Sequence, residues 1–212
     1  MLKVRDLSVR YPNSEAFVLD GVELSAPSGV TGIIGPSGSG KTTLFRAISG
    51  QVRPQRGVIL LGDEPVTPQT TVGLVFQDFR LVDFLNVIDN VRIARQLHGL
   101  DGDEARCAQL LSAVGLDGLE RRQLASLSGG QLQRVAIARA LAIEPDILLA
   151  DEPTGALDRR NSDVVAGILH ELGEQASIPI LLATHDLRLA ETAARIYSLD
   201  GLGGMQLVGR AA

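Results

Sequence analysis

A glycine-rich segment in the first quarter of the chain combines residue types that can hold phosphate groups. It reads Gly35, Pro36, Ser37, Gly38, Ser39, Gly40, Lys41 and Thr42. This order fits the pattern G-x-x-x-x-G-K-[ST] at every fixed position, after an apolar run and before an amphipathic segment. Glycines let backbone N–H groups turn toward an anion, and the positive end of a following helix points at the same place. We expect Lys41 to reach the β- and γ-phosphates of a nucleotide and Thr42 to ligate Mg²⁺. The alternative is a flexible glycine loop without a ligand.

Two carboxylates follow an apolar run late in the chain. Residues 147–150 are Ile-Leu-Leu-Ala, and Asp151 and Glu152 come directly after them. A phosphate loop needs a metal-holding aspartate at the end of a neighbouring buried strand, so Asp151 is the expected Mg²⁺ partner. Glu152 lies outside the apolar run and can polarise a water molecule for in-line attack on the γ-phosphate. The alternative is an acid pair that only caps a strand at the surface.

Buried parallel strands are needed to place these two segments side by side. Apolar runs at residues 30–34, 72–76, 147–150 and 180–184 predict such strands, and residues 57–61 predict another strand. Residues 1–32 alternate apolar and polar side chains, with turns expected at 12–14 and 27–29, which is typical of antiparallel strands. A last hairpin is expected at residues 196–208, with its turn at 201–204.

The pattern becomes helical from about residue 82 to residue 143. One predicted helix face carries Val87, Val91, Ala94 and Leu97, and a second carries Cys107, Leu110, Leu111 and Val114. The sequence therefore predicts a parallel α/β core with an antiparallel edge and a helical insertion.

Composition limits the classes of protein to which the chain can belong. It has 212 residues, of which 45% are hydrophobic, and this suits one globular domain. The formal charge of −5 argues against nucleic acid as a main partner. The single cysteine, Cys107, excludes an internal disulfide, and we interpret it as a half-buried helix residue. Neither a secretory signal nor a stretch of ~18 apolar residues is found, so we expect a cytoplasmic protein that can sit against a membrane partner.

The phosphate loop and the acid pair fit kinases, GTPases, helicases and transport ATPases alike. A third motif narrows this choice. Residues 127–131 read Leu-Ser-Gly-Gly-Gln, and here the sequence resembles the ATP-binding-cassette (ABC) ATPases. The other motifs of that family appear in order along the chain. They are an aromatic residue for adenine stacking at Tyr11, the Q-loop at Gln77, the acid pair Asp151-Glu152, the D-loop ending at Asp158, and the switch histidine His185.

The resemblance implies a fold and a division of the chain. The fold is an α/β P-loop NTPase core with a parallel sheet, an antiparallel β edge subdomain and an inserted α-helical subdomain. Residues 1–81 and 144–212 correspond to the core with its β subdomain. Residues 82–143 correspond to the helical subdomain that carries the Leu-Ser-Gly-Gly-Gln motif, with a helix expected from about Gln131 to Ala142.

The resemblance also implies a shared site with ATP and Mg²⁺ as cofactors. Two copies of the chain would sandwich two ATP molecules as an ATP-dependent homodimer. Each copy would offer Ser128, Gly129, Gly130 and Gln131 to the γ-phosphate held by the other, with Ser128 as the N-cap of a helix. The implied catalytic residues are Lys41, Gln77, Glu152 and His185, and the implied metal ligands are Thr42, Gln77 and Asp151. Thr43 joins Tyr11 and the loop residues 35–42 in the implied ATP-binding set.

A separate integral membrane permease is the implied partner, with the chain peripheral on the inner face of the cell membrane. Short cassettes of this kind look most like the lipoprotein-release, macrolide-efflux and cell-division group, which favours an exporter motor. Three features depart from that group: Ala156, Leu132 and the segment 78–84, which lies where the family docks its permease. The chain also ends soon after Asp200, so we expect no regulatory domain of the sugar-importer type. The alternatives are an importer subunit and a signalling module that transports nothing.

Overall fold

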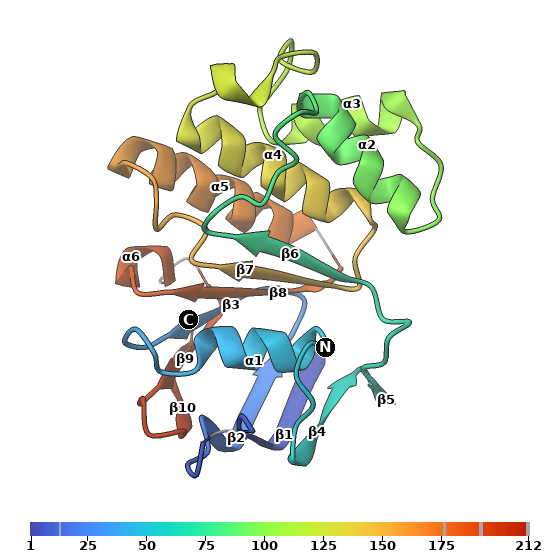
Figure 1. Cartoon of the computed structure of the whole chain (residues 1–212). Coiled ribbons are helices and arrows are strands. Elements are labelled where there is room, and N and C mark those ends of the chain that lie inside the picture. Colours follow the sequence, from blue (N-terminus) through green and yellow to red (C-terminus); the bar gives the residue numbers. More distant parts are fainter. Residues whose placement is uncertain (13, 176, 191–192, 211–212) are drawn as a thin grey trace.

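A six-stranded sheet runs through the middle of the molecule in the computed structural model (Figure 1). Its order is β10-β9-β3-β8-β7-β6, and every neighbouring pair except β10 and β9 is parallel. The strands are β3 (Gly29–Ile34), β6 (Val72–Phe76), β7 (Ile147–Asp151), β8 (Pro179–Thr184), β9 (Arg195–Leu199) and β10 (Met205–Arg210). The structure describes residues 1–212 except 13, 176, 191–192 and 211–212, and it gives no side-chain description for 187, 188 and 210.

The parallel strands of this sheet bring distant segments of the chain to one edge. Val72 pairs with Ile147, Leu148 with Ile180, and Gly29 with Pro179. The carboxyl ends of β3, β6, β7 and β8 therefore meet at the same edge, which is where ligands bind in sheets of this kind. The phosphate loop, Gln77, Glu152 and His185 each follow one of these four strands.

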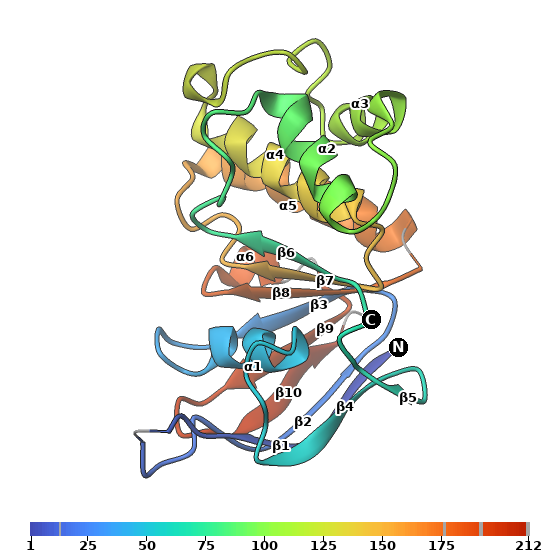
Figure 2. The ribbon, with the colours of Figure 1, turned by 45° about the vertical axis from the view of Figure 1, so that its right-hand side comes forward.

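A four-stranded antiparallel sheet lies below the central sheet, in the order β2-β1-β4-β5 (Figures 1 and 2). Its strands are β1 (Leu2–Val9), β2 (Leu19–Ala26), β4 (Arg56–Leu61) and β5 (Glu64–Pro65). The antiparallel strands expected within the first 32 residues are confirmed for β1 and β2, whereas residues 29–32 belong to β3 and pair in parallel. Asn13 of the first expected turn lies outside the described residues. The final hairpin is confirmed as well, because β10 pairs with β9 across the turn at 201–204.

Period-two alternation along the buried strands divides the core into two layers. Leu149, Leu181 and Ile33 point to one face and pack with α1 (Lys41–Ile48) and the antiparallel sheet. Leu148 and Leu182 point to the other face and pack with the helices above it. The two views of the ribbon show α1 between the sheets and α4 and α5 on the opposite side (Figures 1 and 2). Each central strand is apolar on both faces for this reason.

The helices that follow β6 form the upper part of the molecule. They are α2 (Val87–Leu97), α3 (Glu104–Ala113), the short 3-10 helix η1 (Leu124–Ser126) and α4 (Gly129–Ala142), while α5 (Arg159–Gln175) and α6 (Leu187–Ala190) flank β8 in sequence. The predicted α/β core with an antiparallel subdomain and a helical subdomain is confirmed. No helix in the described part of the chain is long and apolar enough to span a membrane.

The structure corrects three local predictions within these helices. Leu97, expected on the apolar face of its helix, is 77% exposed, and Arg95 is the buried residue near the end of α2. An arginine can be buried there because its guanidinium bonds the Ala142 carbonyl and ion-pairs with Asp101 and Glu144. Helix α4 begins at Gly129, two residues before the expected start. Cys107 is fully buried rather than half-buried.

Candidate nucleotide site

The phosphate loop joins β3 to α1, and Gly35, Gly38 and Gly40 have the positive φ values that its turn requires. Gly40 is the N-cap of α1 with φ 105°, and a Cβ at this position would lie 2.8 Å from Cδ2 of Leu19. Lys41 Nζ donates to the carbonyl oxygens of Gly35 at 2.8 Å and Pro36 at 3.2 Å. Its side chain is only 8% exposed. The lysine is therefore held by the loop that it completes, with its ammonium group at the mouth of the loop.

Thr42 and Asp151 form the second part of the site. Thr42 Oγ1 donates to Asp151 Oδ2 at 2.9 Å, although the two residues are 109 positions apart. Burial raises the pKa of Asp151, and the Thr42 hydrogen bond opposes that shift. Two neighbouring oxygen ligands fit Mg²⁺, which keeps several waters and takes one or two protein oxygens together with substrate phosphates. When bound, the ion would be held by these two side chains, with Gln77 in the same depression as the third predicted ligand, and it would neutralise phosphate charge.

Glu152 and His185 meet at the carboxyl ends of β7 and β8. Nδ1 of His185 lies 2.8 Å from Oε2 of Glu152, and Oε1 of Glu152 lies 3.6 Å from Lys41 Nζ. Glu152 has φ 49°, an unusual backbone conformation for a non-glycine residue, and its amide donates to the Ala183 carbonyl. The carboxylate is thus fixed by its backbone and contacted on both oxygens.

Gln77 completes this edge of the sheet at the end of β6. It lines a depression of about 430 Å³ with Thr42, Asp151 and Glu152. Its side-chain amide lies against Gly155, where an added Cβ would be 3.0 Å from Nε2. A second depression, of about 260 Å³, is formed by Lys41, Thr42, Asp151, Glu152 and the loop residues Ser37–Gly40. The structure therefore brings together the predicted residues Lys41, Thr42, Gln77, Asp151, Glu152 and His185.

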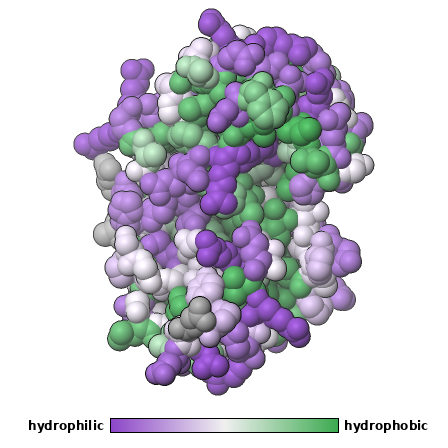
Figure 3. Space-filling view, viewed as in Figure 1, coloured by the Kyte–Doolittle hydropathy of each residue, from purple (hydrophilic) through white to green (hydrophobic). Residues whose placement is uncertain are grey.

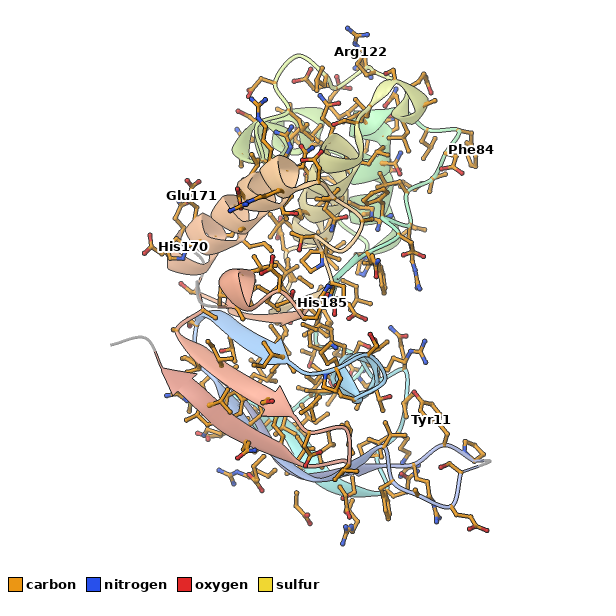
Figure 4. All side chains as sticks on the ribbon, turned by 90° about the vertical axis from the view of Figure 1, so that its left-hand side faces the viewer. Tyr11, Phe84, Arg122, His170, Glu171 and His185 are labelled. Atoms are coloured by element: carbon orange, nitrogen blue, oxygen red, sulfur yellow. The ribbon has the colours of Figure 1, made fainter. Side chains whose placement is uncertain are left out.

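Tyr11 lies at the outer side of the same region, apart from His185 (Figure 4). Its hydroxyl is 3.3 Å from Thr43 Oγ1 and accepts a hydrogen bond from Arg46 at 3.4 Å. The Thr43 hydrogen bond lowers the pKa of Tyr11, more strongly than burial raises it. Tyr11 and Thr43 are therefore adjacent, and the stacking of Tyr11 on adenine stays a prediction.

The Leu-Ser-Gly-Gly-Gln segment forms a well-capped helix start. The Ser128 hydroxyl accepts from the Gln131 amide, and the Gln131 side chain accepts from the Ser128 amide at 2.8 Å. Gly129 is exposed, whereas Gly130 is buried. None of the residues described as lining the two depressions comes from this segment. Within one chain, the structure therefore leaves the second anion-binding helix end apart from the phosphate loop.

Asn161 and the D-loop explain why Gly130 has no side chain. A Cβ on Gly130 would lie 2.2 Å from Oδ1 of Asn161 on α5. Asp158 accepts hydrogen bonds from the Asn161 amide at 2.9 Å and from its side chain at 2.7 Å, and these bonds lower the pKa of Asp158. Asp158 thus anchors the residue that packs on Gly130. Asn161 is not among the residues predicted from the sequence. The only local signal for it is its position three residues after Asp158, the spacing of a helix cap.

A larger groove of about 860 Å³ opens at the other end of α1. Its lining is mostly apolar and includes Ile48, Val52, Val66 and Val72, with Arg53 and His98 at its margin. Figure 3 shows hydrophobic side chains gathered around this hollow on the right of the molecule. No carboxylate lines it among the described residues, and it lies at the opposite end of α1 from the phosphate loop. It is therefore not the nucleotide site.

The fold and this site define a P-loop nucleoside triphosphatase of the α/β class. Comparison with protein families matches residues 19–155 to the family described as "ABC transporter". The chain belongs to this family, and it is an ABC transporter ATPase. The taurine import ATP-binding protein TauB of Pseudomonas fluorescens (strain Pf0-1) is 40% identical over 90% of this chain and 74% of its own length. The sulfate/thiosulfate import ATP-binding protein CysA of Mesorhizobium japonicum is 40% identical over 99% of this chain and 64% of its own length.

Two solved structures show the same architecture. The ATP-binding cassette MJ0796, described as a dimeric post-hydrolysis state bound to ADP and Pi, superposes with a TM-score of 0.84 and 29% identity over 100% of both chains. The structure of cbiO1 from Clostridium perfringens, part of the transporter complex cbiONQ, gives a TM-score of 0.88 and 30% identity over 99% of this chain and 88% of that one. The curated relatives are named as import proteins, which favours the alternative of an importer subunit over the exporter motor expected from the sequence.

Proposed function

We propose that this chain hydrolyses ATP as the motor subunit of an importer and drives a separate membrane permease. The observation that carries the proposal is 40% identity over 90% of the chain to a taurine import ATP-binding protein. Importer names recur among the other relatives, for sulfate/thiosulfate and for methionine. Taurine, sulfate, thiosulfate and methionine all contain sulfur, so small sulfur-containing solutes are the first class to test.

The contacts at the sheet edge support a role for each site residue. Lys41 and the loop amides bind the β- and γ-phosphates, and Thr42, Asp151 and Gln77 hold Mg²⁺. Glu152 accepts the proton of the attacking water, because it is the carboxylate that lies beyond the metal-binding pair. His185 holds the Glu152 carboxylate through its Nδ1 contact and leaves its other ring nitrogen for the γ-phosphate.

An ATP-dependent homodimer follows from the separation of the two anion-binding segments. The helix start at Ser128 and Gly129 is exposed, and it is not part of the depressions at the phosphate loop. Its N–H groups are suited to a phosphate brought by a second copy. The dimeric assemblies described for MJ0796 support this arrangement.

The segment 78–84 offers a surface for the permease. Phe84 is 84% exposed and projects from the upper part of the molecule (Figure 4). An aromatic side chain exposed to this extent is costly in water and is typical of a contact surface. We expect Phe84→Ser to lower co-purification with the permease. Leu202→Ser is the matched control, because Leu202 is 88% exposed on the β9–β10 turn. Equal loss in both variants would remove Phe84 from the interface.

The direction of transport is tested in proteoliposomes that contain the chain and its permease, with the binding protein outside. ATP is enclosed in the lumen, so that only complexes whose ATPase subunits face inward can hydrolyse it. Labelled taurine, sulfate and methionine are then supplied outside in separate runs. We expect ATP-dependent accumulation of one of them and none with Lys41→Ala. ATP-dependent release of a preloaded solute, with no accumulation of any, would favour an exporter.

A further inference from the structure

The turn that follows Gln77 has a backbone that needs support. Phe79 has φ 57° and Arg80 has φ 49°, so two consecutive non-glycine residues are in the left-handed region. Residues that have a Cβ atom rarely adopt this backbone conformation, and two such residues in succession are rarer still. Such a turn persists only where its surroundings hold it, and it lies two residues beyond a side chain that faces the nucleotide site.

Arg139 supplies that support from α4. Its guanidinium donates through Nη2 to the Phe79 carbonyl at 2.9 Å and through Nη1 to the Arg80 carbonyl. The fork of an arginine can hold two adjacent carbonyl oxygens at once, which an ammonium group cannot do with the same geometry. Arg139 is half-buried, so water competes only partly for these bonds.

A second contact joins the same turn to the start of α4. The ring of Phe79 lies beside Gly129, where an added Cβ would be 4.0 Å from Cζ. The turn therefore lies near the first residue of α4 and is bonded by Arg139 in the last turn of that helix. Other restraints come from β6 and from the turn itself. The Phe79 amide donates to the Phe76 carbonyl at 3.3 Å, and the Arg80 guanidinium lies 3.9 Å from the centre of the Phe76 ring. Arg80 also pairs with Asp78 at 3.2 Å, and their side chains are 58% and 67% exposed. Such a pair contributes little.

We propose that Arg139 is the positioning residue that fixes the turn 77–80 to α4 and thereby holds Gln77 at the nucleotide site. The inference rests on the proposed metal role of Gln77. The two Arg139 hydrogen bonds tie the helix that begins with the Leu-Ser-Gly-Gly-Gln motif to the turn that follows β6. Arg139 lines neither of the two depressions at the site, and it acts through the backbone of the turn.

Arg95 provides a matched control for simple loss of stability. It is also an arginine that donates to a backbone carbonyl at α4, that of Ala142, and its side chain is 6% exposed. Its other partners, Asp101 and Glu144, lie away from β6 in sequence and are not in either depression at the site. Arg139→Met and Arg95→Met should both lower the melting temperature, but only Arg139→Met should disturb the turn.

The experiment combines two readouts that do not depend on turnover. Hydrogen exchange is measured over residues 77–82 of the full chain, and binding of a fluorescent ATP analogue is titrated with Mg²⁺ in the Glu152→Gln background. We expect Arg139→Met to speed exchange in this segment and to raise the half-saturating Mg²⁺ concentration by about tenfold, the lower end for loss of a residue that orients a metal ligand. For Arg139→Lys, the exchange rate and the half-saturating Mg²⁺ concentration should lie between those of Arg139→Met and wild type. Arg95→Met should change neither readout.

Gln77→Ala tests the metal role of Gln77 separately from the positioning role of Arg139. It should raise the Mg²⁺ requirement by itself, and adding Arg139→Met to it should raise the requirement no further. If Gln77→Ala shifts the Mg²⁺ titration and Arg139→Met does not, the positioning role is overturned while the role of Gln77 stands. If neither variant shifts it, the metal role of Gln77 is overturned and this inference falls with it. An equal shift in Arg95→Met would show a general loss of stability and would also overturn the inference.

Discussion

Nδ1 of His185 lies 2.8 Å from Oε2 of Glu152, which joins the residues that follow two neighbouring parallel strands. The other oxygen of Glu152 faces the Lys41 ammonium at 3.6 Å. The carboxylate proposed as the base is thus held between a histidine and the lysine of the phosphate loop. Each of the two partners can be tested separately, because each contacts a different oxygen of the carboxylate.

Lys41→Ala should weaken ATP binding by about 10–100-fold, because hydrogen bonds to charged groups contribute roughly 1.5–3 kcal/mol. Equilibrium binding of labelled ATP measures the effect. Lys3→Ala is the matched control, since the chain has only two lysines and Lys3 pairs with Asp63 far along the antiparallel sheet. Wild-type affinity in the Lys41 variant would contradict the assignment of the phosphate loop.

Gly130→Ala should destabilise the protein by roughly 1–3 kcal/mol, as overpacking of a filled site does. The added Cβ would lie 2.2 Å from Oδ1 and 2.8 Å from Cβ of Asn161. Chemical denaturation measures the loss, and Gly130→Ala combined with Asn161→Gly should recover part of it. Gly129→Ala is the milder comparison, because its nearest neighbour would be 3.5 Å away. If both alanine variants lose the same stability, the packing argument for Gly130 is wrong.

Cys107 should react with a maleimide only after unfolding. The thiol is fully buried, and burial raises its pKa above the ordinary value, so both access and thiolate content are low. Labelling followed by mass spectrometry, with and without denaturant, gives the result. Rapid labelling of the native protein at neutral pH would show that the core around α3 opens readily.

Asp151→Asn should raise the melting temperature of the nucleotide-free protein at neutral pH. Burial raises the pKa of Asp151 in the folded state, so its charged form opposes folding. That cost is fully present above the raised pKa, and it disappears as the pH falls below the ordinary aspartate value. The advantage of the asparagine variant should therefore shrink on acidification. A lower melting temperature at neutral pH, or a gain that grows in acid, would reverse this sign.

Much of the architecture could be predicted because its signals are local. The apolar strands, the phosphate loop and the Ser128 cap each show in a few consecutive residues. The position of Arg95 could not be predicted, since the three groups that make its burial possible come from two other segments. The tight fit of Gly130 on Asn161 and the bonds of Arg139 to the turn 79–80 are also tertiary contacts. No spacing in the sequence indicates them.

The rate of ATP hydrolysis by Glu152→Gln tests the account most directly. Glutamine keeps the size of the side chain and can still bond His185, but it cannot accept the proton of the attacking water. Lys41, Thr42 and Asp151 are unchanged, so Mg-ATP should bind with an affinity close to that of wild type. General-base assistance contributes typically ~10²–10⁴ in rate, and single-turnover hydrolysis at saturating Mg-ATP should fall by at least the lower figure. The ATP-loaded dimer should then accumulate, and light scattering should detect its mass. Hydrolysis within a few-fold of wild type would contradict the assignment of Glu152 as the base.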